Sequence, residues 1–261
     1  MLNSRVARLR LSLTVALVGL PAIVLTAGTR TSAAPVAAAA DVASAAAAAV
    51  EVATISTAGV TSSAASAFDV ASWDEAAIGD VDPTVFETAL LAAETAVKRG
   101  DVADPGTLTV IDFSRRSTEK RMWVYDLRSR ALLFDELVSH GRGSGQAMAS
   151  AFSNDAESNR SSLGLYRTGE TYIGKHGYSL RLDGLEPGFN DHARERGIVM
   201  HAADYVNAQT ARAQGYLGRS LGCPALRPEI TKSVIDAVKG GGLLFAYYPD
   251  PHWLKTSKYL S

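Results

Sequence analysis

The chain contains a single cysteine, Cys223, and a thiol is the side chain best suited to covalent nucleophilic chemistry. It lies between Gly222 and Pro224, a context typical of a turn rather than of a helix or strand interior. A thiol attacks as the thiolate, so it needs a base or a positive charge nearby. The backbone amides of Gly222 and Cys223 are candidate donors to the oxyanion of an acyl transfer, because glycine permits close approach. A buried cysteine that only packs in the core would have the same sequence signature.

The residues available as a base are the five histidines His140, His176, His192, His201 and His252. His201 ends the apolar run 198–200, so we expect a strand to hold it rigidly, which suits a general base. His140 ends a strand in the same way, and His176 lies in a Gly-Lys-His-Gly segment. For each of them the alternative is a histidine bonded only to the backbone. No metal site is expected, because one cysteine and scattered histidines do not form a ligand cluster.

The elements expected to position these residues are mostly strands. Short apolar or alternating runs predict strands at 108–113, 122–127, 132–138, 198–200 and 243–248. Short linkers between them favour hairpins, so we expect a mainly β, mainly antiparallel architecture with short helices. An amphipathic helix is predicted to begin at Asp82 and Pro83 and to end before Gly100, and a second is predicted at 228–239. The segment 141–163 is rich in Gly, Ser and Asn and is predicted to be a long loop that flanks the site.

The N-terminal part has the composition of an export signal followed by a tether. Three arginines precede an apolar run over 11–25, and small residues follow it. We predict a signal peptide at 1–34, an Ala-rich flexible tether at 35–67, a helical extension at 68–104 and a catalytic domain at 105–261. The protein is therefore expected to be exported to the periplasm, the cell wall or the exterior, and an uncleaved signal segment would anchor it to the membrane.

Several ordered blocks resemble the L,D-transpeptidase catalytic domain, and most narrowly its murein L,D-transpeptidase catalytic domain branch. Segments 199–205 and 219–225 are similar to its signature of a histidine followed by Ser-x-Gly-Cys. Further matching blocks lie at 111–114, 140–142, 152–154, 161–164 and 175–180. The likeness covers roughly 105–248. The broader family commonly has histidine where this chain has Leu221, and the separation 223 − 201 = 22 is longer than in most members.

The resemblance implies a catalytic domain of β-sandwich or barrel type, preceded by the amphipathic helix. It implies that Cys223 is the nucleophile and His201 the base, acting on a peptidoglycan stem tetrapeptide. Attack at the third residue would release D-alanine and leave a thioester, which passes to an amine. The residues implied for the oxyanion pocket and for orienting the base are Gly222, Ala202, through its carbonyl, and Ser220. The residues implied for substrate binding are Arg219, His176, Tyr178 and His140.

The resemblance also implies that carbapenems acylate the thiol and that no cofactor is required. The expected partners are peptidoglycan stem peptides; the formal net charge of −1 gives no field that would attract nucleic acid. We expect a monomer with at most transient membrane association through the N-terminal segment.

Three other functions remain open. Transfer to water would make the protein an L,D-carboxypeptidase. A sortase-like acyltransferase shares the order of histidine before cysteine and could use Arg227. A non-catalytic cell-wall binding module would have a buried, inert Cys223. A papain-like hydrolase is disfavoured, because its cysteine ordinarily precedes its histidine.

Overall fold

The computed structural model describes residues 67–261. The predicted signal peptide and the predicted tether lie outside the described residues, except for Ala67, which is buried. Within the described part no helix is long and apolar enough to cross a membrane.

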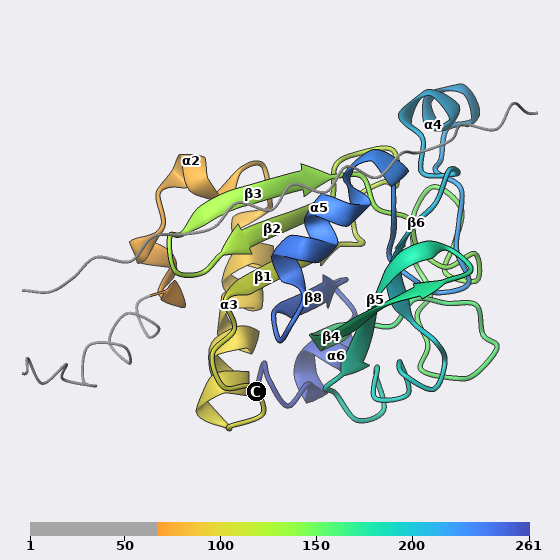
Figure 1. Ribbon diagram of the computed structural model, residues 1–261. Helices are drawn as coiled ribbons and strands as arrows, with labels where there is room; N and C mark the ends of the chain where they lie inside the picture. Colours follow the sequence, from red (N-terminus) through yellow and green to blue (C-terminus); the bar gives the residue numbers. More distant parts are fainter. Residues whose placement is uncertain (1–66) are drawn as a thin grey trace, which may run out of the picture. The chain divides into compact units, whose positions relative to one another are not determined.

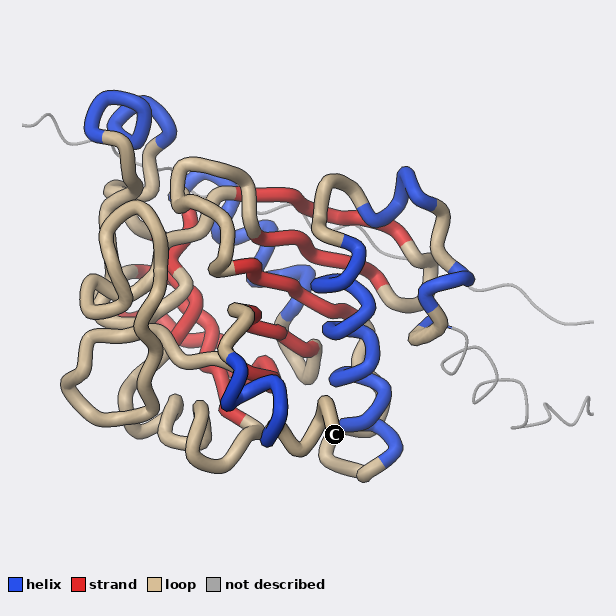
Figure 2. The backbone as a smooth tube through the Cα atoms, turned by 180° about the vertical axis from the view of Figure 1, so that it is seen from behind, coloured by secondary structure: helices blue, strands red, loops and turns tan. Residues whose placement is uncertain are grey.

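Eight strands form one sheet in the order β3-β2-β1-β8-β4-β5-β6-β7. The strands are β1 (Thr107–Asp112), β2 (Met122–Asp126), β3 (Ala131–Glu136), β4 (Gly164–Gly174), β5 (Gly177–Gly184), β6 (Val199–Ala202), β7 (Ala225–Leu226) and β8 (Leu243–Tyr247). Neighbouring strands are antiparallel except for the β1–β8 and β6–β7 pairs, which are parallel. The sheet twists strongly, so that strands β5 and β6 are steeply inclined to strands β1, β2 and β3 (Figures 1 and 2). The mainly β architecture of sandwich or barrel type is confirmed.

The helices are short, apart from one. They are α2 (Glu75–Ile78), α3 (Pro83–Lys98), α4 (Ala208–Gln214), α5 (Pro228–Val238) and α6 (Pro251–Thr256), with a 3-10 turn η1 (Val70–Ser72). The Asp82 carboxylate caps α3 by accepting the N–H of Thr84 at 2.8 Å, and Pro83 fits its first turn. Helices α3 and α5 lie on opposite faces of the sheet (Figures 1 and 2). Both helices predicted from the sequence are confirmed.

The inner face of α3 forms part of the main core. Phe86 is fully buried, and its ring centroid lies 5.1 Å from that of Trp73 and 4.8 Å from that of Tyr125 on β2. On the other face of the sheet, α5 buries Val234 and Val238. Burial of each large apolar side chain contributes about 1.5–3 kcal/mol, so both helices stabilise the sheet substantially.

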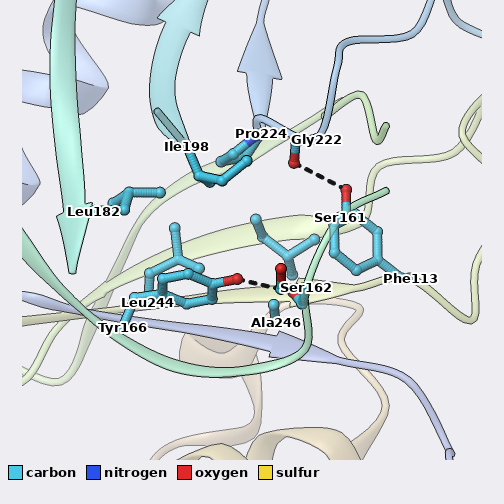
Figure 3. A pocket seen from close by; sticks show the side chains of 11 residues that line it. Phe113, Ser161, Ser162, Tyr166, Leu182, Ile198, Gly222, Pro224, Leu244 and Ala246 are labelled. Atoms are coloured by element: carbon cyan, nitrogen blue, oxygen red, sulfur yellow. Dashed lines mark hydrogen bonds between the residues drawn. The ribbon is translucent and has the colours of Figure 1, made fainter. Parts of the chain in front are cut away.

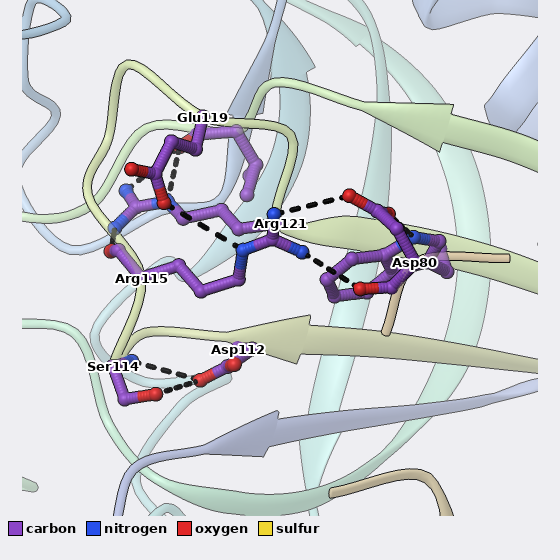
Figure 4. Close-up of polar contacts among 8 residues, drawn as sticks. Asp80, Asp112, Ser114, Arg115, Glu119 and Arg121 are labelled. Atoms are coloured by element: carbon purple, nitrogen blue, oxygen red, sulfur yellow. Dashed lines mark hydrogen bonds and ion pairs between the residues drawn. The ribbon is translucent and has the colours of Figure 1, made fainter. Parts of the chain in front are cut away.

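Polar contacts also tie the segment 67–104 to the sheet and to the C-terminal residues. Asp80 accepts hydrogen bonds from Arg115 at 3.0 Å and from the Trp123 indole at 2.9 Å (Figure 4). Asp101, just after α3, accepts the hydroxyl of Tyr259 at 2.8 Å. The segment is therefore packed against the sheet through both apolar and charged groups.

Candidate active site

Cys223 lies in a turn that leads into β7, and Ser220 fixes the shape of this turn. The Ser220 hydroxyl donates to the Cys223 carbonyl at 2.7 Å and accepts the N–H of Gly222 at 3.0 Å. The Ser220 backbone bonds to the His140 carbonyl at 3.0 Å and to the Arg142 N–H at 2.8 Å. The Gly222 N–H, which the sequence predicts to be an oxyanion donor, thus bonds within the turn in this structure.

The loop 141–163 supports the same turn from the other side. The Ser161 hydroxyl donates to the Gly222 carbonyl at 3.1 Å and accepts the N–H of Gly141 at 3.0 Å (Figure 3). Gly222 has φ +129°, and a Cβ there would lie 2.8 Å from the carbonyl oxygen of Arg160. Only glycine fits this position without displacing the loop. The loop therefore flanks the cysteine, as the sequence predicts.

A small apolar cavity lies under the turn. Its volume is about 10 Å³, close to the least that one water needs, and few polar atoms line it. Gly222 and Pro224 close it on one side, and side chains of the sheet, including Tyr166 and Leu244, close it on the other (Figure 3). The turn thus rests on the core rather than on solvent.

The Cys223 thiol is half-buried and has few polar partners. The N–H of Val199 lies 3.5 Å from the sulfur, and the sulfur lies 3.6 Å from the carbonyl oxygen of Gly197. Burial raises the pKa of the thiol, an effect partly offset by the Val199 N–H and by the charges of Arg196 and Lys175. The sulfur reaches a pocket, so it is not sealed in the core.

His201 lies on β6, where it pairs with Ser179 of β5 and with Ala225 of β7. Its Nδ1 is 2.8 Å from the carbonyl oxygen of Ala202. A carbonyl oxygen only accepts, so Nδ1 carries the proton and Nε2 is left as the basic nitrogen. The ring is buried, and His176 stacks on it with a centroid separation of 4.3 Å. Burial lowers the pKa of His201, and the Ala202 hydrogen bond opposes this shift.

One pocket of about 410 Å³ brings the thiol and the imidazole together. Its walls come from the β4–β5 hairpin, the start of β6 and the cysteine turn. It is lined by Tyr172, Lys175, His176, Arg196, Gly197, Ile198, Val199, His201, Tyr205, Arg219, Ser220, Leu221 and Cys223. Three of these side chains are cationic and none is acidic, so the pocket favours an anionic ligand. Within residues 67–261 no three His, Cys, Asp or Glu side chains gather as metal ligands would.

The pocket contains Arg219 and His176 but not the other two residues expected to bind substrate. Arg219 donates to the Gly145 carbonyl at 2.9 Å, which fixes its position at the pocket wall. The Tyr178 hydroxyl instead bonds to Asp236 of α5 at 2.9 Å.

His140 is fully buried outside the pocket, so the substrate-binding role expected for it is not supported. Its Nδ1 lies 2.8 Å from a terminal nitrogen of Arg121, which is also fully buried. Arg121 further donates to the Val138 carbonyl at 2.8 Å. Burial, and next the charge of Arg121, lowers the pKa of His140 to about 3, so the ring is neutral. His140 therefore helps to hold the segment after β3, against which the cysteine turn packs.

Several lining residues were not singled out as site residues from the sequence: Tyr172, Lys175, Arg196 and Tyr205. Arg196 lies three residues before β6, the strand that carries His201, and this position is the signal that the sequence offers. Tyr172 comes from β4, a strand that the apolar pattern does not predict. Its place in the site therefore cannot be predicted from the sequence.

Comparison with known proteins gives one family. A model of the L,D-transpeptidase catalytic domain matches residues 77–247, more than half of the chain. The match begins before α3, whereas the likeness found in the sequence begins near residue 105. No curated protein matches the chain.

The solved structures that match the chain are distant from it in sequence. They include an L,D-transpeptidase from Mycobacterium smegmatis, with 14% identity, a TM-score of 0.35 and coverage of 56% of this chain and 60% of that one. L,D-transpeptidase 3 from Mycobacterium tuberculosis, in complex with a faropenem-derived adduct, has 15% identity, a TM-score of 0.36 and coverage of 56% and 61%. An L,D-transpeptidase from Stackebrandtia nassauensis has 15% identity, a TM-score of 0.33 and coverage of 66% and 73%. The chain thus spans about three fifths of the length of the mycobacterial structures. By the match over residues 77–247, the chain belongs to the L,D-transpeptidase catalytic domain family.

Proposed function

We propose that the protein is a peptidoglycan L,D-transpeptidase with Cys223 as nucleophile and His201 as general base. One observation carries the proposal: the chain's single thiol shares a pocket with an imidazole whose proton is held on the far nitrogen by Ala202. That arrangement leaves an acceptor nitrogen for the thiol proton, which acyl transfer requires. Membership of the L,D-transpeptidase family supports peptidoglycan stem peptides as the substrate.

The reaction has two steps. His201 Nε2 takes the proton of Cys223, and the sulfur attacks the carbonyl carbon of the third stem residue. The peptide C–N bond breaks, D-alanine leaves with the proton from the imidazolium, and a thioester remains on the sulfur. An amine then attacks the thioester, His201 takes its proton, and the C–S bond breaks with return of that proton to the thiol.

The developing oxyanion needs a donor close to the sulfur. Because Ser220 already accepts the Gly222 N–H, the Cys223 N–H is the remaining candidate within the turn. Removal of one such donor typically costs about 2.7–4 kcal/mol of transition-state stabilisation. Ser220 contributes indirectly, since it holds the carbonyl of Cys223 and so orients the next peptide group.

The cationic lining suits a stem peptide, whose free carboxylates make it anionic. Arg219 is the candidate partner of one carboxylate, and His176 lies against the base at the pocket wall. Water as acceptor would give an L,D-carboxypeptidase on the same thioester. We propose that the protein is exported through its N-terminal segment, residues 1–34, acts in the periplasm or cell wall, and is a monomer.

Acylation by a carbapenem tests the proposal. Intact-mass measurement of the purified protein should show an adduct of one carbapenem, and the Cys223→Ala variant should show none. Serine retains the shape of the turn but lacks the acidity of a thiol, so Cys223→Ser is the matched variant and should acylate far more slowly. Equal masses for the treated and untreated native protein would sink the proposal and favour a binding module.

A further inference from the structure

Arg196 connects the loop 141–163 to the pocket, and the two-step reaction gives it no role. Its two terminal nitrogens donate to two carbonyl oxygens and two hydroxyl groups of the loop. These acceptors are Ser153 O at 2.8 Å, Ser162 Oγ at 2.5 Å, Ser158 Oγ at 3.2 Å and Arg160 O at 2.6 Å. A planar guanidinium can make such a fork of four bonds, whereas an ammonium group cannot match its geometry.

The loop that Arg196 holds is the one that supports the cysteine turn. Ser161, between two of its acceptors, donates to the Gly222 carbonyl at 3.1 Å. The Arg160 carbonyl, one of the four acceptors, is also the group that a Cβ at Gly222 would meet at 2.8 Å. Arg196 therefore fixes the surface on which the residue before the nucleophile rests.

The charge of Arg196 is only partly balanced. All four of its hydrogen bonds go to neutral groups, and burial lowers the pKa of the guanidinium. The carboxylate of Asp155 acts on this charge, and so does Cys223 once its thiol is ionised. A cation in this position interacts with the thiolate more strongly than a solvated one does, because less water screens it.

The fold also brings Arg196 close to the Cys223 sulfur. It lines the pocket with Cys223, and the following residue, Gly197, has its carbonyl oxygen 3.6 Å from the sulfur. The other titratable or charged groups around the pocket and the sulfur are Tyr166 and Tyr172 of β4, Lys175 and His176 of the β4–β5 turn, His201 of β6, and Tyr205 and Arg219 of the segment before β7.

We infer that Arg196 is a positioning residue for the nucleophile: its guanidinium fork holds residues 153–162 under the cysteine turn, and its positive charge favours the thiolate of Cys223. The use of this thiolate in acyl transfer rests on the proposed function. The effect on the sulfur and on the loop is a property of the free protein and can be measured without any substrate.

The test is the pH dependence of Cys223 alkylation by iodoacetamide in the full chain. With Arg196→Gln, the rate at pH 7 should fall about tenfold and the profile should move to higher pH, because the cation is lost. Arg196→Lys keeps the charge and should remain within about threefold of the native rate. Arg194→Gln is the matched control: Arg194 is exposed, and it bonds to Asp183 at 2.5 Å and to Glu170 at 2.9 Å, outside the pocket. It should leave the profile unchanged.

Hydrogen exchange of the amides in 153–162 measures the second role. Both Arg196 variants should exchange faster there than the native protein, and Arg194→Gln should not. A native alkylation profile in Arg196→Gln, or native exchange in Arg196→Lys, overturns the inference. If Arg196→Gln does not unfold cooperatively, the Arg196→Lys variant tests the inference alone. A native-like alkylation rate together with faster amide exchange in 153–162 then supports the inference. Failure of carbapenem acylation in the native protein contradicts the proposed function, while these measurements still decide the role of Arg196.

Discussion

Burial shifts the pKa values of the Cys223 thiol and the His201 imidazole in opposite directions. It raises the pKa of the thiol and lowers the pKa of the imidazole, so both groups are neutral near pH 7. The resting pair is therefore a thiol beside a free base rather than a thiolate beside an imidazolium. In this state the base removes the thiol proton while the bond to the substrate forms. Loss of the base should therefore lower the acylation rate itself.

Replacing His201 by alanine should slow carbapenem acylation at pH 7 by about 100-fold or more, since a positioned base contributes about 10²–10⁴. Time-resolved intact-mass spectrometry measures the rate. The control is His192→Ala, because His192 is exposed and its nearest acidic partner is Asp191 at 4.0 Å, away from the pocket. An unchanged rate in His201→Ala would transfer the role of base to another group, with the stacked His176 as the first to examine.

The pH profile of the same reaction follows from the lowered pKa of His201. A base with a lowered pKa gains its proton only at a pH below the ordinary histidine range. The native acylation rate should therefore hold as pH falls through 6.5 and decline below that value, and His201→Ala should lack this decline. A rate that falls already above pH 7 would contradict the assigned shift.

At the scale of elements, the sequence predicts those strands whose apolar residues are contiguous. Strands β1, β2 and β8 are buried nearly throughout, so their runs stand out. The β4–β5 hairpin was missed because β4 is half-exposed and interrupted by glycine and charged residues, with a register shift between Thr168 and Thr171. It nevertheless forms one wall of the pocket.

The candidate site, like the sheet, could be predicted only in part from the sequence. Cys223 and His201 could be chosen from residue type and context, and both line the pocket. His140 has an equally suggestive context, yet the fold buries it against Arg121. Arg196 has no motif of its own, because its partners are 34 to 43 residues earlier and meet it only after the loop has folded back.

The turn before the nucleophile offers a prediction at this scale. Gly222→Ala should destabilise the protein, because it combines a positive φ with a Cβ 2.8 Å from both the Arg160 oxygen and the Ile198 Cδ1. Gly240→Ala is the matched variant, since Gly240 has φ +84° and nothing within 4 Å of its built Cβ. We expect a loss of about 1 kcal/mol for Gly240→Ala and clearly more, about 2–4 kcal/mol, for Gly222→Ala. Denaturant unfolding measures both, and equal losses would refute the clash.

At the scale of the described molecule, the segment before residue 105 is part of the core and not an appendage. Helix α3 contacts β1 and β8, and the family match begins ahead of it, at residue 77. Asp101 accepts a hydrogen bond from Tyr259, so the segment is also bonded to the C-terminal residues. The sheet that carries His201 therefore depends on a helix that does not line the pocket.

Two substitutions in α3 measure this dependence. Phe86→Ala should lower the free energy of unfolding by about 3–5 kcal/mol, because a fully buried ring against Trp73 and Tyr125 is replaced by a cavity. Leu91→Ala, on the same helix but 48% exposed, should change it by about 0.5 kcal/mol or less. Neither residue lines the pocket, so carbapenem acylation per folded molecule should be unchanged in both. Similar losses of stability for the two variants would mean that α3 is not packed on the sheet. A slower acylation in Phe86→Ala at full folding would mean that α3 also sets the geometry of the pocket.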